Sequence, residues 1–328
     1  MQYNNLPGTN LKVSVVSLGT MMFGKQTGEA DALSIMDYAF EQGVNFFDTA
    51  NTYNEGESER IVGKWLKNHR DELFLATKVS GPTAPGSFNR GLSRRNILAA
   101  VDESLKRLGT DYIDLYYLHV PDHETEIEES LHTFSTLVES GKIRYVGISN
   151  YAAWEVADIL AICDKRGYTP PVVSQNVYNA ITRGVEPELI PCLLKHKLGM
   201  VVYNPIAGGL LAGKHRPGEP AADTRFANQK NYYDRYWSDE NFAAIGKLTE
   251  IARDEGVSIL EFAMRWCLGR SGVTSVISGV SKLEQIKQNL AFVDGKTLSL
   301  QAQAAADKVW QSLAGTRFAY HRALAAGS

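Results

Sequence analysis

Four side chains that can move a proton stand at or just after the ends of short apolar segments. They are Asp48 and Tyr53 in FFDTANTY, Lys78 in FLATKV and His119 in DLYYLHVPD. A tyrosine hydroxyl has an unperturbed pKa of about 10, but an ammonium about 4 Å away favours tyrosinate by about 4 kcal/mol at an effective dielectric of about 20. Lys78 can supply that ammonium, and Asp48 can keep it charged, although the carboxylate itself opposes the effect. With His119 orienting the substrate oxygen, the four predict a site that gives a proton to a carbonyl.

Each of these residues also has a purely structural interpretation. Asp48 and Lys78 can form an ion pair within the fold, Tyr53 can be a loop aromatic, and His119 can be a core histidine with satisfied hydrogen bonds. All four at strand ends favour catalysis, because closed parallel sheets keep their chemistry on that rim. An aldolase that uses Lys78 as a Schiff-base nucleophile is a further alternative. A proton donor alone does not reduce a carbonyl, so a reductase requires a hydride source elsewhere in the chain.

The elements that must position these residues follow a regular alternation of short apolar segments and longer helical patterns. The segments are apolar on both sides, as is typical of parallel strands covered on both faces. Eight strand–helix units without a break in composition predict an α/β fold, a single (β/α)8 TIM barrel over residues 1–328 with its active site at the C-terminal strand ends. An open doubly wound sheet is the alternative. The predicted strands are 13–20, 44–49, 73–79, 112–119, 143–149, 171–176, 199–204 and 274–279.

Two segments depart from the alternation. Residues 1–16 contain the turn PGTN and predict a β-hairpin that closes the bottom of the barrel. Residues 205–237, rich in glycine, proline and tyrosine, form a long connection after the seventh strand. Loops of this length inside a compact domain are usually functional.

Composition excludes several classes of protein. A net charge of −3 over 328 residues gives no reason to expect a nucleic-acid or membrane partner. No apolar stretch approaches the roughly 18 residues that span a bilayer, and the N-terminal segment lacks the layout of a signal peptide. Three cysteines without metal-like spacing, Cys163, Cys192 and Cys267, predict buried free thiols, no metal site and a cytoplasmic location.

Polar residues at the later strand ends predict where a hydride donor binds. Ser149, Asn150 and Gln175 offer the donors and acceptors that a carboxamide needs, and Tyr203 can stack on a flat ring. Taken singly, each is equally a turn-stabilising polar residue or a packed aromatic. The chain has no GxGxxG motif, and GGLLAG at 208–213 lacks its spacing, so a Rossmann site is disfavoured.

Two later segments predict contacts with phosphate. The small residues Gly208 and Gly209, with Leu210, allow backbone N–H groups to approach an anion, although a plain flexible turn is equally consistent. Residues 278–289, SGVSKLEQIKQN, read as a strand end, a tight turn and a helix start, which is an anion-binding arrangement. There Ser281 and Lys282 would face a 2′-phosphate, although basic residues can equally lie on a solvated surface.

Five segments, in order and at matching intervals, resemble the aldo-keto reductases. They are GVNFFDTANTYNEGESERIVG, LKRLGTDYIDLYYLH, GKIRYVGISNY, YNPIAGGLLAGK and SGVSKLEQIKQNL, within residues 11–293. The resemblance implies a (β/α)8 barrel in which Asp48, Tyr53, Lys78 and His119 form the catalytic tetrad, with Tyr53 as the proton donor.

The same resemblance implies that the cofactor is NADP(H), preferred over NAD(H). It implies that Ser149, Asn150 and Gln175 hold the nicotinamide and that Tyr203 stacks on it. Further cofactor contacts are expected from Asn204, Ile206, Gly208, Gly209, Leu210, Lys214, Arg225, Gly279, Ser281, Lys282, Gln285, Gln288 and Asn289.

Within the family, the chain looks most like the aflatoxin-aldehyde reductases. Residues 80–96 are instead similar to aryl-alcohol dehydrogenases and potassium-channel β-subunits, and the tail from 315 departs from the arginine-ended tail of the aflatoxin branch. Arg317 and Arg322 can bind an anionic substrate or stay solvated, so a preference for carboxylated aldehydes is left open.

The expected substrate is a small carbonyl compound, and the expected product is an alcohol. The pocket is predicted to be lined by Met21, Met22, Phe23, Trp154 and the aromatics of residues 230–237, which can equally form a packed lid. The alternative function is a regulatory subunit that binds NADP(H) with little turnover, like the channel β-subunits. A monomer and a homodimer are both compatible with the sequence.

Overall fold

Eight parallel strands close into a barrel in the computed structural model, which describes residues 1–83, 89–222 and 224–315. The strand order is β10-β3-β4-β5-β6-β7-β8-β9, so neighbours in sequence are neighbours in space. This confirms the (β/α)8 barrel and excludes the open sheet. The barrel strands are β3 (Val16–Gly19), β4 (Phe46–Asp48), β5 (Phe74–Val79), β6 (Ile113–Leu118), β7 (Ile143–Ser149), β8 (Pro171–Val177), β9 (Gly199–Tyr203) and β10 (Val273–Gly279).

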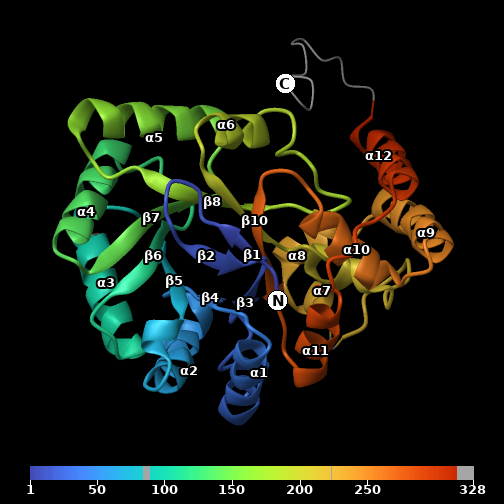
Figure 1. The fold of residues 1–328 in the computed structure, drawn as a ribbon, viewed down its shortest axis with the longest axis horizontal. Coiled ribbons are helices and arrows are strands. Elements are labelled where there is room, and N and C mark those ends of the chain that lie inside the picture. Colours follow the sequence, from blue (N-terminus) through green and yellow to red (C-terminus); the bar gives the residue numbers. More distant parts are fainter. Residues whose placement is uncertain (84–88, 223, 316–328) are drawn as a thin grey trace.

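The N-terminal segment forms the predicted hairpin from β1 (Tyr3–Asn5) and β2 (Lys12–Ser14), which pair antiparallel. Leu6 in its turn is fully buried and packs with side chains inside the barrel, including Phe46 and Val173. Figure 1 shows the hairpin at the centre of the ring of helices. The expected strand 13–20 is wrong in one respect. Val13 and Ser14 belong to the hairpin, and the barrel strand begins only at Val16.

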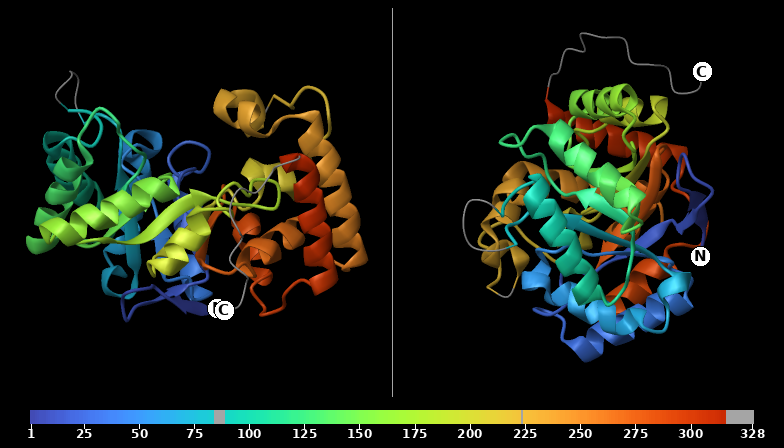
Figure 2. Two further views of the ribbon diagram at one scale, coloured as in Figure 1. Left: turned by 90° about the horizontal axis from the view of Figure 1, so that it is seen from above. Right: turned by 90° about the vertical axis from the view of Figure 1, so that its left-hand side faces the viewer.

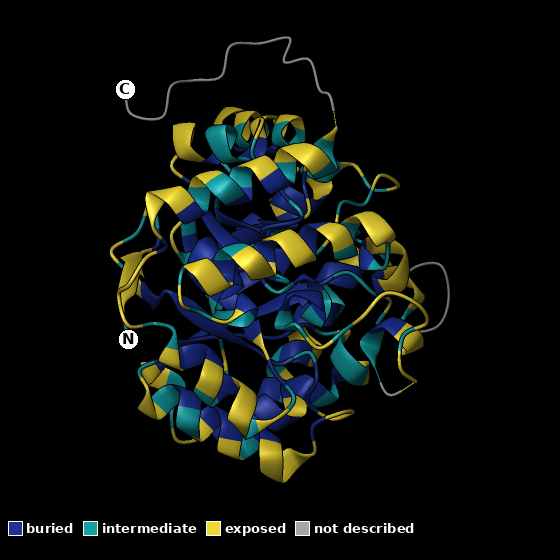
Figure 3. Cartoon of the chain, turned by 90° about the vertical axis from the view of Figure 1, so that its right-hand side faces the viewer, coloured by how far each residue is buried: buried dark blue, intermediate teal, exposed yellow. Residues whose placement is uncertain are grey.

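Helices surround the barrel and bury their apolar faces on its outer side, while their solvent faces are exposed (Figure 3). Predicted helix ends are confirmed at Gly109 and Gly167, which adopt φ of 64° and 69° after the last helical turn. None of the described helices has the length and hydrophobicity to cross a bilayer. The helices around the barrel are α1 (Glu29–Glu41), α2 (Glu57–Leu66), α3 (Arg94–Leu108), α4 (Ile127–Glu139), α5 (Ala153–Arg166), α6 (Leu189–Lys195), α10 (Ile259–Leu268) and α11 (Leu283–Ala291).

Two further helices, α9 (Asp239–Asp254) and α12 (Leu300–Ala314), lie side by side at one flank of the barrel (Figures 1 and 2). Short 3₁₀ turns, η1 (Tyr53–Gly56) and η2 (Arg70–Glu72), flank α2. The tail from residue 316, with Arg317 and Arg322, lies outside the described residues, as do residues 84–88 of the segment 80–96.

The long connection 205–237 is more ordered than the sequence predicts. It contains the 3₁₀ turn η3 (Ala207–Ala212) and two short helices, α7 (Arg225–Asn228) and α8 (Lys230–Tyr236). The physical reason is aromatic packing, since Phe226 and Tyr236 are buried and Trp237 Nε1 donates to the Gly218 carbonyl at 2.6 Å. The Trp237 bond holds the segment together, and Asn204, directly after β9, donates to the Tyr236 hydroxyl at 3.5 Å.

Candidate active site

A fully buried lysine links two of the predicted proton-handling residues. Lys78 Nζ donates to Asp48 Oδ1 at 2.5 Å, to the Thr49 carbonyl at 2.6 Å and to the Tyr53 hydroxyl oxygen at 3.2 Å. These three contacts use all three protons of the ammonium. Asp48 ends β4 and pairs in register with β5, which carries Lys78, so adjacent strand ends bring the two side chains together.

Tyr53 is held against Lys78 by an unusual turn. The next two residues, Asn54 and Glu55, adopt φ of 50° and 58°, the left-handed region that side chains other than glycine rarely occupy. The Asn54 amide donates to the Met21 and Phe23 carbonyls at 2.9 and 2.6 Å. The loop after β3 therefore secures the strained turn that positions the tyrosine.

The pKa of Tyr53 differs from the expectation that the Lys78 ammonium would lower it. Burial raises the pKa of Tyr53; the Lys78 ammonium lowers it and the Asp48 carboxylate raises it, and the pKa lies above its usual value. Lys78 does favour tyrosinate, but burial outweighs the effect. Burial lowers the pKa of Lys78, yet Asp48 and Tyr53 raise it by more, so the lysine stays charged. At neutral pH the site thus pairs a protonated tyrosine with an ammonium.

His119 follows β6 and faces the same cavity as Tyr53, with the two rings edge to face and 6.1 Å between centroids. Its backbone is fixed on both sides, because its N–H donates to the Val79 carbonyl and its carbonyl accepts from Asn150, each at 3.1 Å. Burial and the Lys78 charge lower the pKa of His119 to about 3, so the imidazole is neutral at physiological pH. Sequence reasoning missed the partner of its Nδ1, the Ser80 hydroxyl, at 3.1 Å.

The polar residues predicted for the nicotinamide form one connected group beside the tetrad. The Ser149 hydroxyl donates to the Gln175 carbonyl at 2.9 Å, and the Tyr203 hydroxyl donates to Asn150 Oδ1 at 2.7 Å. Gln175 Nε2 donates to Asp48 Oδ2 at 2.8 Å, which ties this group to the buried ion pair. The side chains expected to hold a carboxamide are therefore connected, through Asp48 and Lys78, to Tyr53.

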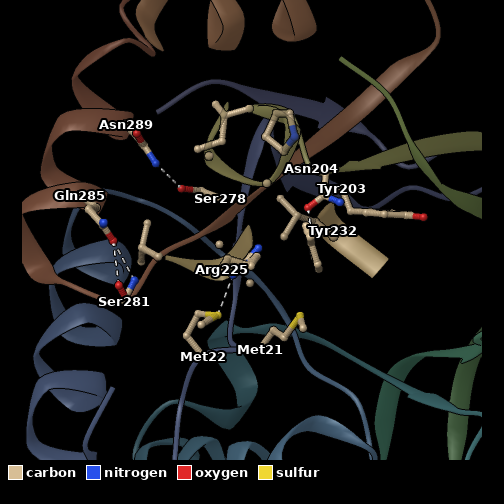
Figure 4. A pocket seen from close by; sticks show the side chains of 18 of the residues that line it. Met21, Met22, Tyr203, Asn204, Arg225, Tyr232, Ser278, Ser281, Gln285 and Asn289 are labelled. Atoms are coloured by element: carbon tan, nitrogen blue, oxygen red, sulfur yellow. Dashed lines mark hydrogen bonds between the residues drawn. The ribbon is translucent and has the colours of Figure 1, made fainter. Parts of the chain in front are cut away.

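One cavity is lined by Asp48, Tyr53 and His119 and also by residues at the start of α11. Figure 4 shows the part of it between Tyr203 and α11. Lys78 lies beneath it, without any exposed surface. The predicted site residues that line the cavity are Asp48, Tyr53, His119, Ser149, Asn150, Gln175, Tyr203, Asn204, Ile206, Gly208, Gly209, Lys214, Arg225, Gly279, Ser281, Gln285, Gln288 and Asn289, together with the pocket candidates Met21, Met22 and Tyr232.

Besides Lys78, seven predicted residues do not line the cavity, and three of them, Tyr233, Tyr236 and Trp237, are aromatics of residues 230–237 that pack within or beside their own segment. Phe23 and Leu210 are buried in the hydrophobic core, because their side chains pack inward where their neighbours face the cavity. Trp154 is 65% exposed in the first turn of α5, and Lys282 is exposed at the start of α11. Of the predicted aromatics of residues 230–237, Tyr232 alone lines the cavity.

Bare backbone and a helix start occupy the far end of the cavity. Gly209 has a φ of 113°, and a Cβ placed on Gly279 would meet no atom within 4 Å, so both leave room for a ligand to approach the main chain. Figure 4 shows Gln285 folded back on Ser281 and Asn289 bonded to Ser278. The glycines and amides at this end fit the phosphate groups of a dinucleotide cofactor.

Positive charge dominates the cavity walls. Three cations, Lys214, Arg225 and Arg235, line it, whereas among the described lining residues the sole carboxylate, Asp48, is already paired with Lys78. Arg225 Nη2 donates to Met22 Sδ at 2.8 Å, so α7 reaches across to the loop after β3 (Figure 4).

Arg235 was missed because only the aromatics of its segment were considered, although the arginine was visible among them. Arg235 lines the same cavity as Tyr203. Burial raises the pKa of Tyr203 to about 12, while the Arg235 guanidinium lowers it. Arg235 forms no salt bridge with any described carboxylate. In the described part of the chain, no three acidic, histidine or cysteine side chains gather as metal ligands would.

The structure is a (β/α)8 barrel with a polar cavity at the carboxyl ends of its strands. Residues 15–311 match the aldo/keto reductase family. The chain belongs to this family, and it is an oxidoreductase that acts on carbonyl groups. Members of the family use nicotinamide cofactors.

Relatives of both expected kinds are similar over nearly the whole chain. A probable voltage-gated potassium channel subunit beta of Arabidopsis thaliana is 35% identical, over 95% of this chain and 96% of its own length. Human aflatoxin B1 aldehyde reductase member 2 is 35% identical, over 90% of this chain and 86% of its own. Human aldo-keto reductase family 7 member A3 is 35% identical, over 89% of this chain and 92% of its own length.

Proposed function

We propose that the chain reduces aldehydes or ketones to alcohols with NADPH, with Tyr53 as the proton donor. The contact that carries the proposal is the Lys78 ammonium, 3.2 Å from the Tyr53 hydroxyl and bonded to Asp48. Because Lys78 donates to the tyrosine oxygen, the hydroxyl proton of Tyr53 is free for an acceptor in the cavity. A structural ion pair alone would not need to contact a tyrosine that lines a cavity.

Each residue of the tetrad has a distinct role. When bound, the nicotinamide supplies the hydride. Tyr53 donates its proton to the substrate oxygen, and Lys78 stabilises the tyrosinate that remains. Asp48 keeps Lys78 charged and in place, and Gln175 holds the second oxygen of that carboxylate. His119, as a neutral imidazole, donates a hydrogen bond to the same substrate oxygen.

We propose NADPH over NADH because the start of α11, at the end of the cavity away from the tetrad, is suited to bind an anion. Ser281 and Gln285 line the cavity there, where the positive end of the helix dipole favours an anion such as a 2′-phosphate. Arg225 also lines the cavity, with its guanidinium against Met22 and the Tyr232 ring. Its charge suits the phosphates that NADPH and NADH share.

Arg235 points to carbonyl substrates that carry a carboxylate. It lies beside Tyr203, close to the nicotinamide-type residues, and has no described carboxylate partner. The guanidinium lies over the Tyr236 ring and interacts with the Tyr203 hydroxyl, and its charge can pair with a substrate anion. The name of one relative, an aflatoxin B1 aldehyde reductase, is consistent with an aldehyde substrate.

A regulatory subunit with little turnover is the second candidate, because a similar protein is named as a potassium channel subunit beta. The two candidates are separated by following NADPH absorbance with 4-nitrobenzaldehyde, 4-carboxybenzaldehyde and 9,10-phenanthrenequinone. Turnover of at least one compound supports the reductase. Tight NADPH binding without turnover on the whole panel would replace it with the regulatory function.

A further inference from the structure

The neutral imidazole of His119 has two tautomers, and only one can assist a carbonyl. A neutral histidine carries its proton on one ring nitrogen and accepts a hydrogen bond at the other. Nδ1 lies 3.1 Å from the Ser80 hydroxyl. Nε2 has no hydrogen-bond partner among residues 1–83, 89–222 and 224–315, and the ring lines the cavity. If Nδ1 carried the proton, Nε2 would present a lone pair to a substrate oxygen and repel it.

Ser80 is placed to decide between the tautomers. Its hydroxyl makes no other side-chain hydrogen bond within the described residues, so its proton is free to go to Nδ1. Ser80 comes directly after the last residue of β5, Val79, and two residues after Lys78, so the extended chain carries both side chains toward the same face. The same strand end thus contacts both predicted donors to the substrate oxygen, Tyr53 through Lys78 and His119 through Ser80.

We propose that Ser80 is a positioning residue that donates its hydroxyl proton to His119 Nδ1 and holds the imidazole as the Nε2–H tautomer. The consequence for catalysis depends on the proposed carbonyl reduction, whereas the tautomer itself does not. With Nε2–H fixed, the cavity presents two donors to one oxygen, the Tyr53 hydroxyl and the His119 imidazole. Without Ser80, water can bond to Nδ1, or the ring can adopt the Nδ1–H tautomer. In the second case Nε2 carries no proton, and His119 no longer donates to the substrate oxygen.

The test is nitrogen-15 NMR on the full chain with labelled histidine at pH 7, with the His119 signals assigned by their loss in His119→Gln. Wild type, Ser80→Ala and Ser80→Thr are compared, because threonine keeps the hydroxyl. Ser34→Ala is the matched control, since that hydroxyl bonds only within α1 at an exposed position. Thermal unfolding and NADPH binding of each variant are measured alongside, which separates a local effect from damage to the fold.

The proposal expects protonated Nε2 and bare Nδ1 in wild type, a mixed or reversed pattern in Ser80→Ala, and recovery in Ser80→Thr. It also expects kcat to fall by about 10-fold in Ser80→Ala with little change in the KM for NADPH, the scale of one hydrogen bond. A protonated Nδ1 in wild type would overturn the proposal, as would an unchanged tautomer in Ser80→Ala. If no carbonyl is turned over, the proposed reduction fails, and the tautomer spectra still decide the role of Ser80.

Discussion

Lys78 and Tyr53 lie 3.2 Å apart, nitrogen to oxygen, with the ammonium completely buried beneath the cavity and the tyrosine on its wall. Burial keeps Tyr53 protonated, and in the proposed reaction the charge contact would stabilise the tyrosinate left after proton transfer. The proposed effect of Lys78 is therefore greatest when Tyr53 loses its proton. This arrangement gives the first two predictions.

Replacing Tyr53 with phenylalanine removes the proton and leaves the ring. We expect kcat with an accepted aldehyde to fall by about 100-fold or more, the scale of general acid catalysis. NADPH should bind as before, because the polar group on Ser149, Asn150 and Gln175 is untouched. Stopped-flow absorbance and a fluorescence titration with NADPH measure the two effects. A variant that keeps most of its kcat would show that another group supplies the proton.

The buried pair of Lys78 and Asp48 offers a test that separates stability from catalysis. Lys78→Met leaves a buried carboxylate without its cation, so we expect the free energy of unfolding to fall by about 3–5 kcal/mol. Adding Asp48→Asn removes the unpaired charge and should restore most of that stability. The double variant should remain as inactive as Lys78→Met, because the tyrosinate still lacks a cation. Urea unfolding and kcat measure the two outcomes, and recovery of kcat in the double variant would assign Lys78 a structural role only.

The low pKa of His119 predicts how stability depends on pH. Its folded pKa of about 3 lies below the ordinary value of 6.5, so the unfolded chain binds more protons between these values. Stability from this group is therefore complete above pH 6.5 and is lost as the pH falls, by about 2 kcal/mol between pH 7 and pH 5. Urea unfolding of wild type and His119→Gln at pH 5 and pH 7 isolates the contribution. Equal pH dependence in both would contradict a buried neutral imidazole.

The barrel and much of the site could be predicted because they depend on local pattern. Apolar segments without alternation gave the eight strands, and the carboxyl ends of parallel strands must meet at one rim. Asp48 and Gln175 are 127 residues apart in sequence, yet their contact follows from both ending strands of the same barrel. Position along a strand was therefore enough to place the tetrad and the nicotinamide-type residues together.

Contacts that depend on the path of a loop could not be predicted in this way. Met22 faces the cavity and Phe23 the core, although they are adjacent, because the backbone turn between them decides the direction of each side chain. Ser80 is recognisable only once β5 and β6 are side by side. The helices of 205–237 form because their aromatic side chains pack against the rest of the protein. The composition of the segment, rich in glycine and proline, does not reveal this packing.

The preference for NADPH is tested by a single charge at the start of α11. Gln285→Glu keeps the side-chain oxygens that accept from the backbone N–H groups of Ser281 and Lys282, so the helix start is preserved. The added negative charge repels a 2′-phosphate, and we expect the KM for NADPH to rise by about 10-fold with little change for NADH.

Two comparisons sharpen this cofactor test. Glu284→Gln, on the same turn but exposed and outside the cavity, is the control for charge in general. Lys282→Ala should have a smaller effect on the KM for NADPH than Gln285→Glu, because its side chain is exposed and screened by solvent. An equal loss with NADPH and NADH in Gln285→Glu would remove the 2′-phosphate from this end of the cavity.

Arg235 predicts which carbonyl compounds the cavity prefers. Its guanidinium lies beside Tyr203 and has no described carboxylate partner, so it can pair with a carboxylate on the substrate. We compare 4-carboxybenzaldehyde with its neutral methyl ester, which keep the same ring and the same aldehyde. Arg235→Gln should lower kcat/KM for the acid by about 10-fold and leave the ester nearly unchanged, the scale of one charged hydrogen bond.

Arg253→Gln, a highly exposed arginine on α9, is the matched control. Added salt should reduce the advantage of the acid in wild type and have little effect in Arg235→Gln, because the contact is solvent-facing. If the acid and the ester lose equal activity in Arg235→Gln, the arginine supports the shape of the cavity and does not select the charge of the substrate.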